Sequence, residues 1–335
     1  MLTRVAVRLA VTVLVALALA PVATSAAQSS YSVIEIGPTA GFETTSGLGI
    51  NQSGQVVGTL QPSSYYGPRS AFVWARSSGV RALGRFEGRD TVGGGINDRG
   101  EVAGTGLGGV YDPGAAFRWT ATGGFERIGS GAPSGINNAR EVSGTVLGPG
   151  PLYWDAMARP HALPGLVGTQ GTANAINDRT QIVGYSYSRT GYPHPYVWDP
   201  RAGIRDIGTF LRDGTGSGVA YDINELGHVV GYTEGSDYSS RAFLWRDGRL
   251  TAVGPPLSYG YAVNNHDHVV GQFNAAGALR AFVSRGASFT NLNRLIPSGS
   301  GVVLTDARAI NDTGWIVANG RNRQGGQRAF VLIPR

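Results

Sequence analysis

Residues 95–104, GINDRGEVAG, read as two short strands joined by a tight turn, and versions of this phrase recur along the chain. The aliphatic residue before the Asn stands at positions 50, 96, 136, 176, 223, 263 and 310, so the unit repeats every 40–47 residues. Each unit continues into a second strand such as QVVG, a third such as AFVW and a fourth such as IRDIG. Four short strands at this period predict the blades of a β-propeller.

The two ends of the repeat region complement each other. Residues 32–37, SVIEIG, match the fourth strand of a unit, whereas residues 329–335, AFVLIPR, match a third strand. Pairing these ends closes a ring and leaves no open sheet edge. We therefore predict an all-β fold over residues 31–335, a seven-bladed β-propeller of four-stranded antiparallel blades, closed by pairing the N-terminal strand with the C-terminal blade. An open β-solenoid is the alternative, but it would not need complementary ends.

Residues 1–27 have the three parts of a secretory signal peptide. Arg4 and Arg8 form a basic start, an apolar run covers about residues 9–20, and small residues follow near 25–27. The run is too short to span a membrane, although a retained anchor is the alternative. We expect a secreted protein, extracellular or periplasmic, with no membrane span after cleavage. Because the chain has no Cys, its stability must come from packing.

Charge and composition exclude several partners. The net charge is +6, but no run of basic residues is present, so we expect no nucleic acid partner. The pattern Gly104-x-Gly106-x-x-Gly109 matches a dinucleotide fingerprint by its letters only, because no helix pattern follows it. We expect a monomer without a cofactor.

The repeated I-N-x-x-G-x-V-V-G phrase, followed by x-A-F-V-W, resembles the HAF-type extracellular repeat family of bacteria over about residues 46–335. This resemblance implies an exported repeat protein whose activity is not assigned. The chain departs from the pattern in the His-Ala-Phe tripeptide itself. Only His194 occupies the His position, and Arg241, Arg280 and Arg328 replace it in other repeats.

An Asn begins every predicted turn, and in most repeats a Gly ends it. Such an Asn bonds its own backbone two residues on, and Gly tolerates the geometry that follows. Calcium is the alternative, because Asp98, Asp178, Glu225 and Asp312 come next, but one carboxylate per turn is too few for a calcium loop. Where Arg140, Thr180 and Asp267 replace the Gly, we predict a looser turn or one of another type. The structural turn residues are Asn51, Asn97, Asn137, Asn177, Asn224, Asn264 and Asn311.

Aromatic residues two apart recur in the third strand of the repeats, as in Phe72 and Trp74. Residues two apart share one face of a strand. We predict that this face packs between neighbouring blades, with a sugar-stacking platform as the alternative. The second strand ends in Gly in six repeats, for example Gly58, and we expect a close backbone approach or a bulge there.

The loops between the second and third strands differ most between repeats and hold eight of the 14 Tyr. Tyr supplies rigid contact area in binding surfaces, and Ser and Gly supply adaptable hydrogen bonds. We predict a binding or interaction module for a cell-surface or extracellular glycan or a protein. The alternative interpretation is that Tyr simply extends the hairpins as a good strand former. The candidate ligand-binding residues are Tyr65, Tyr66, Tyr111, Tyr185, Tyr187, Tyr192, Tyr232 and Tyr238.

Two further functions remain open. A polysaccharide-active hydrolase or lyase would need titratable residues at the central channel, and Glu101, Glu141, His228 and His268 are the candidates. His228, His266 and His268 are weak candidates for a zinc site, against the reading as exposed turn residues. A structural surface protein would show no convergent polar cluster at all.

Overall fold

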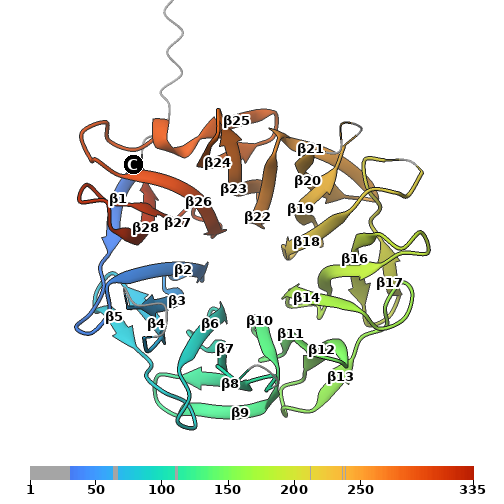
Figure 1. Ribbon diagram of the computed structural model, residues 1–335, viewed down its shortest axis with the longest axis horizontal. Coiled ribbons are helices and arrows are strands. Elements are labelled where there is room, and N and C mark those ends of the chain that lie inside the picture. Colours follow the sequence, from blue (N-terminus) through green and yellow to red (C-terminus); the bar gives the residue numbers. More distant parts are fainter. Residues whose placement is uncertain (1–30, 63–66, 110–111, 212, 236, 238) are drawn as a thin grey trace, which may run out of the picture.

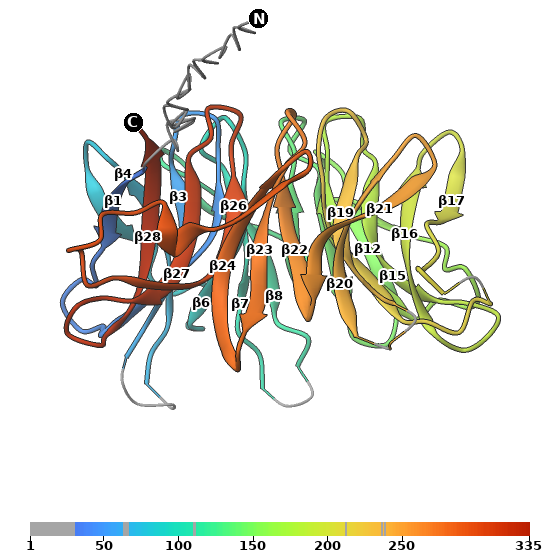
Figure 2. The same ribbon diagram turned by 90° about the horizontal axis from the view of Figure 1, so that it is seen from above.

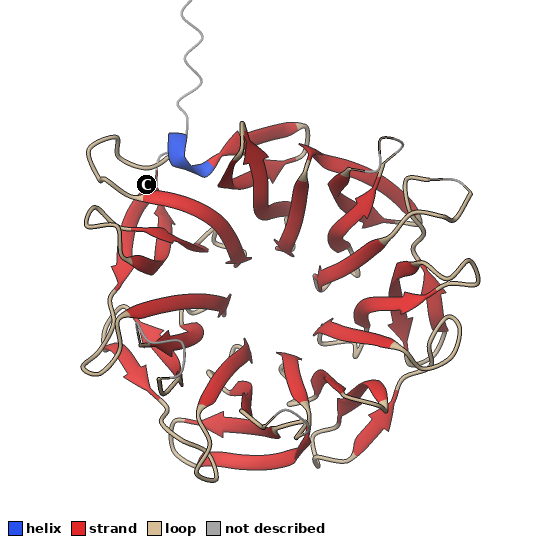
Figure 3. Ribbon diagram, viewed as in Figure 1, coloured by secondary structure: helices blue, strands red, loops and turns tan. Residues whose placement is uncertain are grey.

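Seven four-stranded antiparallel sheets surround a central channel (Figure 1). The computed structural model describes residues 31–62, 67–109, 112–211, 213–235, 237 and 239–335. Within these residues the chain is almost entirely strand and loop, with one short 3₁₀ turn, η1 (Leu292–Arg294) (Figure 3). The predicted seven-bladed propeller is confirmed. The predicted signal peptide, residues 1–27, lies outside the described residues.

Each blade starts at the channel and ends at the rim, so that consecutive strands are neighbours. Blades 1 and 2 consist of β2 (Thr44–Ile50), β3 (Val56–Gln61), β4 (Ser70–Ala75), β5 (Gly79–Ala82), β6 (Thr91–Ile96), β7 (Val102–Gly106), β8 (Ala115–Thr120) and β9 (Gly124–Ser130). Blades 3 and 4 consist of β10 (Ala132–Ile136), β11 (Val142–Val146), β12 (Gly150–Trp154), β13 (Pro160–Ala162), β14 (Gly171–Ile176), β15 (Ile182–Tyr187), β16 (Pro193–Asp199) and β17 (Gly203–Asp206).

The last blade combines both ends of the described chain. Blades 5 and 6 consist of β18 (Gly218–Ile223), β19 (Val229–Glu234), β20 (Ser240–Arg246), β21 (Arg249–Pro256), β22 (Ser258–Val263), β23 (His268–Ala275), β24 (Ala278–Arg285) and β25 (Ser288–Asn291). Blade 7 consists of β26 (Val303–Ile310), β27 (Ile316–Arg321), β28 (Gln327–Pro334) and β1 (Tyr31–Ile36). β1 pairs antiparallel with β28 from Tyr31 opposite Pro334 to Ile36 opposite Ala329, as predicted, so β1 covers the outer edge of β28 and closes the ring.

The disc has two faces, seen edge-on in Figure 2. Because the strands of a blade alternate in direction, the turns after the innermost strands lie on one face, which we call the turn face. The loops between second and third strands and the connections between blades lie on the other, which we call the loop face. Every innermost strand therefore runs from the loop face toward the turn face.

The core lies between neighbouring blades. Phe72, Phe117 and Phe243 of the third strands are fully buried, and Trp74, Trp119 and Trp245 are nearly so. Burying each such side chain contributes about 1.5–3 kcal/mol. Arg81 of blade 1 also stacks on Trp119 of blade 2, with its guanidinium carbon 5.0 Å from the ring centroid. The prediction that these aromatics form core and not a sugar platform is confirmed.

The second-strand Gly permits close packing of the first two strands. A Cβ on Gly58 would lie 2.1 Å from the Ser46 carbonyl oxygen, and one on Gly231 would lie 1.9 Å from that of Val219. The close approach coincides with a bulge in the innermost strand, between Gly47 and Gly49 in blade 1. The expected close approach is thus confirmed, and the bulge lies in the strand opposite the Gly.

Candidate functional site

Each innermost strand has a bulge at the same position of the repeat, and β26 has a second one between Leu304 and Asp306. The register shifts between Gly47 and Gly49 in β2, and equivalent shifts occur in all seven innermost strands. A bulge re-aims the side chain of its extra residue. The extra residues, which we call the bulge ring, are Leu48, Gly94, Ser134, Asn174, Tyr221, Tyr261 and Arg308.

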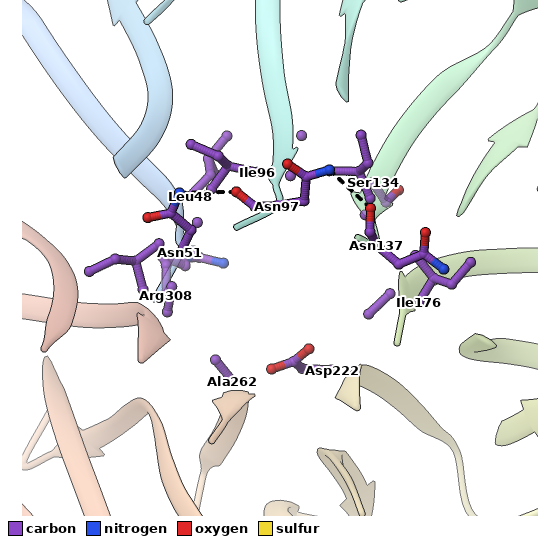
Figure 4. Close-up of a pocket in the computed structure, with 18 of the residues that line it drawn as sticks. Leu48, Asn51, Ile96, Asn97, Ser134, Asn137, Ile176, Asp222, Ala262 and Arg308 are labelled. Carbon is purple, nitrogen blue, oxygen red and sulfur yellow. Dashed lines mark hydrogen bonds between the residues drawn. The ribbon is translucent and has the colours of Figure 1, made fainter. Parts of the chain in front are cut away.

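All seven bulge-ring residues line a single cavity in the channel, with a volume of ≈ 330 Å³. This volume lies at the lower end of the range for small-molecule sites, roughly 300–1,000 Å³. Figure 4 looks into the cavity, with Leu48, Ser134, Asp222 and Arg308 placed around it. The largest side chains of the bulge ring come from blades 5, 6 and 7, and the smaller ones come from blades 1 to 4. The lining of the cavity is therefore asymmetric.

Most polar groups of the bulge ring have no protein partner. Within the described part of the chain, nothing hydrogen-bonds to the hydroxyl groups of Ser134, Tyr221 or Tyr261. Asn174 donates its Nδ2 to the Ala220 carbonyl oxygen at 2.8 Å, which leaves its Oδ1 facing no protein donor among those residues. None of these atoms is among the buried side-chain atoms that lack a partner, so they face the open channel, where a ligand can reach them.

Tyr221 and Tyr261 line the cavity at blades 5 and 6, and Tyr232 and Tyr259 pack against them; we call these four residues the tyrosine wall. Tyr221 and Tyr261 meet edge to face with ring centroids 5.3 Å apart, and Tyr232 and Tyr259 do so at 4.8 Å. Tyr221 also lies 6.0 Å from Tyr232, which links the two pairs. Burial raises the pKa of Tyr261 to about 12, so its hydroxyl is neutral and can both donate and accept.

Arg308 is held in place by groups that use only part of its guanidinium. Its Nε donates to Asp306 Oδ1 at 2.6 Å, and its planar end covers the Tyr261 ring at 4.1 Å from the centroid. Asp306 is itself fixed by donors from Thr305 and Asn319. Asn319 in turn bonds both backbone groups of Gly47 across the ring closure. The two terminal nitrogens of Arg308 find no acceptor in the described residues.

Asp222 is a carboxyl group in the wall of the channel cavity. It follows Tyr221, at a position where the other blades carry Gly or Ala, and it accepts the backbone N–H groups of Ile223 and Val263, both at 2.9 Å. Burial raises its pKa to about 6, and the two hydrogen bonds oppose this only in part. Asp222 therefore changes charge close to neutral pH.

A second ring lies three residues further along each repeat, at the turn face. The Nδ2 of each turn Asn donates to the backbone carbonyl of the next one at 3.0–3.2 Å, from Asn51 to Asn97 and finally from Asn311 back to Asn51. Each Oδ1 accepts the backbone N–H four residues on. We call these seven Asn residues the turn ring; their side chains staple the blades together.

A third ring borders the channel at the turn face, at the residues directly after the turn ring. Each side chain accepts the backbone N–H of its counterpart in the preceding blade at 2.7–3.2 Å. Burial, together with the nearby Asp178 carboxylate, raises the pKa of Glu225. This mouth ring consists of Gln52, Asp98, Asn138, Asp178, Glu225, Asn265 and Asp312.

The turns without Gly are not looser, so that prediction is wrong. Arg140, Thr180 and Asp267 have positive φ angles of 67°, 59° and 59°, and each closes the same hydrogen bond to its turn Asn as Gly does elsewhere. The backbone strain is offset by a contact to the preceding blade. Arg140 pairs with Glu101 at 3.1 Å, and Thr180 donates to Glu141 at 2.7 Å. Asp267 accepts from His228 at 2.7 Å.

Glu101, Glu141 and His228 are thus spread around the turn face and paired between blades. None of these, nor His268, lines the channel cavity, so they do not meet in an active site there. His266 and His268 lie 5.9 Å apart by ring centroid. Across the residues that the structure describes, no group of three or more His, Cys, Asp or Glu is arranged to hold a metal ion.

The Tyr residues predicted to bind a ligand are only partly described. Tyr65, Tyr66, Tyr111 and Tyr238 lie outside the described residues. Tyr185 and Tyr187 belong to β15, and Tyr232 belongs to β19, so these three extend hairpins, as the alternative interpretation held. Tyr187 and Tyr192 are exposed at the loop face, whereas Tyr232 packs into the tyrosine wall of the cavity.

His194, the one His at the tripeptide position, clamps two loops. Its Nδ1 meets Asp206 Oδ2 at 2.9 Å and its Nε2 meets the Gly214 carbonyl oxygen at 3.2 Å. Because both partners are acceptors, both ring nitrogens must donate, which favours the charged form. The hydrogen bond to Asp206 accordingly raises the pKa of His194 despite its burial.

Sequence reasoning missed the bulge ring, although a signal for it existed. The position three residues before each turn Asn carries six residue types in seven repeats, whereas the residues on either side are mostly Gly or Ala. It also missed that the turn ring joins blades, because the spacing within one repeat shows only the turn.

Comparisons with known proteins support the fold and no closer relationship. No protein-family model and no curated protein matches the sequence, so membership of the HAF-type family stays a prediction. The structure is similar to the acylaminoacyl peptidase of Pyrococcus horikoshii, with a TM-score of 0.59 and 10% identity over 90% of this chain and 54% of that chain. A puromycin-hydrolyzing peptidase of Mycobacterium tuberculosis gives a TM-score of 0.59 and 9% identity over 88% of this chain and 53% of that one.

The extracellular domain assigned to a one component system of B. thetaiotaomicron is a further structural neighbour. Its TM-score is 0.55 at 10% identity, and the match covers 90% of this chain but only 40% of that chain. This chain therefore spans well under two thirds of the neighbour's length. At such identity the likeness shows a shared propeller and carries no activity across. In the described residues, no helix has the length and apolar character needed to cross a membrane.

Proposed function

We propose that this protein is a secreted binding module and that its site is the bulge ring, which holds the end of an extracellular glycan. The observation that carries this proposal is the convergence of hydrogen-bonding groups without protein partners on one cavity. Ser134, Asn174, Tyr221, Tyr261 and Arg308 supply these groups. By contrast, the side chains of the turn ring and the mouth ring, several of which also line this cavity, hydrogen-bond within their own rings.

A saccharide fits the chemistry of these groups. Its hydroxyl groups both donate and accept, so they can pair with tyrosine and serine hydroxyls, with the Asn174 Oδ1 and with guanidinium donors. The rings of Tyr221 and Tyr261 add apolar area against which the C–H face of a sugar can pack. Sites built to hydrogen-bond a ligand's hydroxyls discriminate strongly against ligands without them.

The loop face offers a second contact area for a longer glycan or a protein. Tyr187 and Tyr192 are exposed there. The hypothesis that Tyr-rich loops alone form the site predicts that substitutions at the loop face, and not in the channel, abolish binding. One experiment separates the two proposals.

The experiment is a screen of the purified protein on an array of bacterial and plant oligosaccharides, followed by calorimetry on each hit. We expect Tyr221→Phe, which removes one hydroxyl, to weaken binding by about 3- to 10-fold. Tyr221→Ala should weaken it further. Tyr187→Ala is the matched control and should leave the Kd unchanged. Unchanged affinity in both Tyr221 variants, or no binding to any oligosaccharide, would overturn the proposal.

A hydrolase or lyase at the same cavity is the second candidate, and Asp222 is the observation that favours it. A carboxyl with a pKa of about 6 in a channel suits general acid or base catalysis. Incubation of each hit with the protein, followed by chromatography of the sugar, would show shortened chains. Catalysis should disappear in Asp222→Asn, whereas a plain binding module leaves the sugar intact in both proteins.

A further inference from the structure

Resting on the proposed glycan-binding function, we propose that the recognised sugar is acidic, that Arg308 binds its carboxylate, and that the glycan enters from the loop face. Nothing in the fold likeness assigns such a specificity. The inference depends on two features of the channel, namely the unused donors of Arg308 and the opposite charge of the mouth ring.

The first feature is a guanidinium that is held firmly yet incompletely used. Asp306 takes the Nε of Arg308, and Tyr261 supports its flat face. The terminal nitrogens keep their donors for an acceptor from outside the described protein residues. A planar fork of N–H groups matches a carboxylate with two parallel hydrogen bonds, and an arginine fixed beforehand loses little entropy on binding.

The carboxylates of the cavity do not serve as that acceptor. Asp222 accepts two backbone N–H groups. Asp98 accepts from Gln52 and Asn138, and Asp178 accepts from both the backbone and the side chain of Asn138. Each of these groups already has partners of its own, whereas Arg308 has donors to spare.

The second feature is the uneven charge along the channel. Four of the seven mouth-ring residues, Asp98, Asp178, Glu225 and Asp312, are carboxylic acids, and they border the turn-face end. β26 runs from the loop face to the turn face, and Asp306, which anchors the Arg308 side chain, precedes Arg308 on it. The guanidinium is therefore drawn toward the loop-face half, away from the mouth ring.

This arrangement gives an acidic glycan one favourable route. An anion that approaches from the turn face meets four negative charges, which oppose its entry. One that approaches from the loop face passes the tyrosine wall and reaches Arg308 first. The mouth ring then opposes further movement through the channel, so it acts as an electrostatic stop behind the bound sugar.

The test compares trisaccharides of galacturonic acid, of its methyl ester and of galactose by calorimetry at low and high salt. We expect the acid to bind at least about 10-fold more tightly than the ester and the neutral sugar, because a hydrogen-bonded charge pair is lost in both. Arg308→Gln should abolish this preference, so that the acid, the ester and the neutral sugar bind with similar Kd values. Arg189→Gln, which removes an exposed positive charge at the loop face, should preserve it.

The outcomes separate this inference from the proposed function. Equal affinity for the acid and the ester, or a preference that survives in Arg308→Gln, would overturn the acidic specificity while the glycan site stands. No binding of any saccharide, here or on the array, would instead overturn the proposed function itself. Asp98→Asn should tighten binding of the acid by about 2-fold at low salt and have no effect at high salt. Weaker binding in that variant would overturn the repulsion between the mouth ring and the bound acid, and with it the electrostatic stop.

Discussion

The turn ring and the bulge ring lie three residues apart in every repeat, yet they differ in both composition and bonding. The turn ring has the same residue seven times, and every side-chain amide bonds both its own turn and the next blade. The bulge ring has six residue types among its seven members, with Tyr twice, and its polar atoms mostly face a cavity without protein partners. Uniformity thus marks the part of the repeat that holds the ring together, and variation marks the part that faces a ligand.

The physical cause of the uniformity is reciprocity. The side chain of each turn Asn accepts a backbone N–H of its own blade and donates to a backbone carbonyl of the next blade. A side chain of another kind would remove hydrogen bonds from buried groups of two blades. The side chain of a bulge residue makes no such hydrogen bonds between blades, because the backbone forms the bulge. Its side chain is therefore free to differ between blades.

The largest expected effect follows from removing one member of the turn ring. In Asn137→Ala, the Asn177 carbonyl loses one of its two donors and keeps the Thr180 N–H, while the Glu141 N–H loses its side-chain acceptor. Since both groups lie between packed blades, we expect a loss of about 3 kcal/mol in the free energy of unfolding. Ser134→Ala, three residues earlier in the same blade, is the matched control and should change it by less than about 0.5 kcal/mol. Urea unfolding measures both, and equal losses would contradict the comparison.

The second expected effect is a pH dependence of the folding stability, caused by Asp222 in the channel wall beside the bulge ring. Burial raises the pKa of Asp222 from 3.8 to about 6, so the folded state binds its proton more tightly than the unfolded state does. The stabilisation of the folded state by this tighter proton binding is fully present below about pH 4, and it is lost as the pH rises through 6. In Asp222→Asn the amide nitrogen cannot accept the second backbone N–H group, but the side chain no longer titrates, so the stability of the variant relative to the natural protein should rise by about 2 kcal/mol between pH 4 and pH 7.

The measurement for Asp222 is the Tm of both proteins across pH 3–8. The comparison between them cancels the other acidic groups, several of which have lowered pKa values, for example Asp199 and Asp213. A constant difference at all pH values would show that Asp222 titrates normally and that the channel is well hydrated.

The sequence predicted the fold because its signals are periodic and each copy supports the others. Seven turns, the aromatic third strands and the complementary ends all agree, and β1 pairs with β28 as expected. The site was predicted poorly because it depends on a register shift. In a regular strand Tyr221 and Val219 would share a face, but the bulge re-aims Tyr221 toward the channel, and no periodicity reveals this.

Contacts between blades were invisible for a related reason. Arg140 and Thr180 occupy a position where positive φ favours Gly, so local rules predicted another turn. The side chains that make them tolerable, Glu101 and Glu141, lie one blade away, about 40 residues earlier in the chain. Only the closed ring places such pairs together.

The smallest expected effect tests whether the mouth ring belongs with the uniform or with the variable part of the repeat. Asp178 and Glu225 are the one place in the mouth ring where two carboxylic acids are adjacent, since an amide separates the others. Asp178→Asn removes a like charge beside Glu225 but retains a carbonyl oxygen for the Asn138 N–H. We expect a change in unfolding free energy within about 0.5 kcal/mol and a lower pKa of Glu225, measured by NMR titration of its carboxyl group. Burial should still keep that pKa above its ordinary value. A loss of several kcal/mol would place the mouth ring with the turn ring as a structural staple, and an unchanged pKa would show that burial alone raises it.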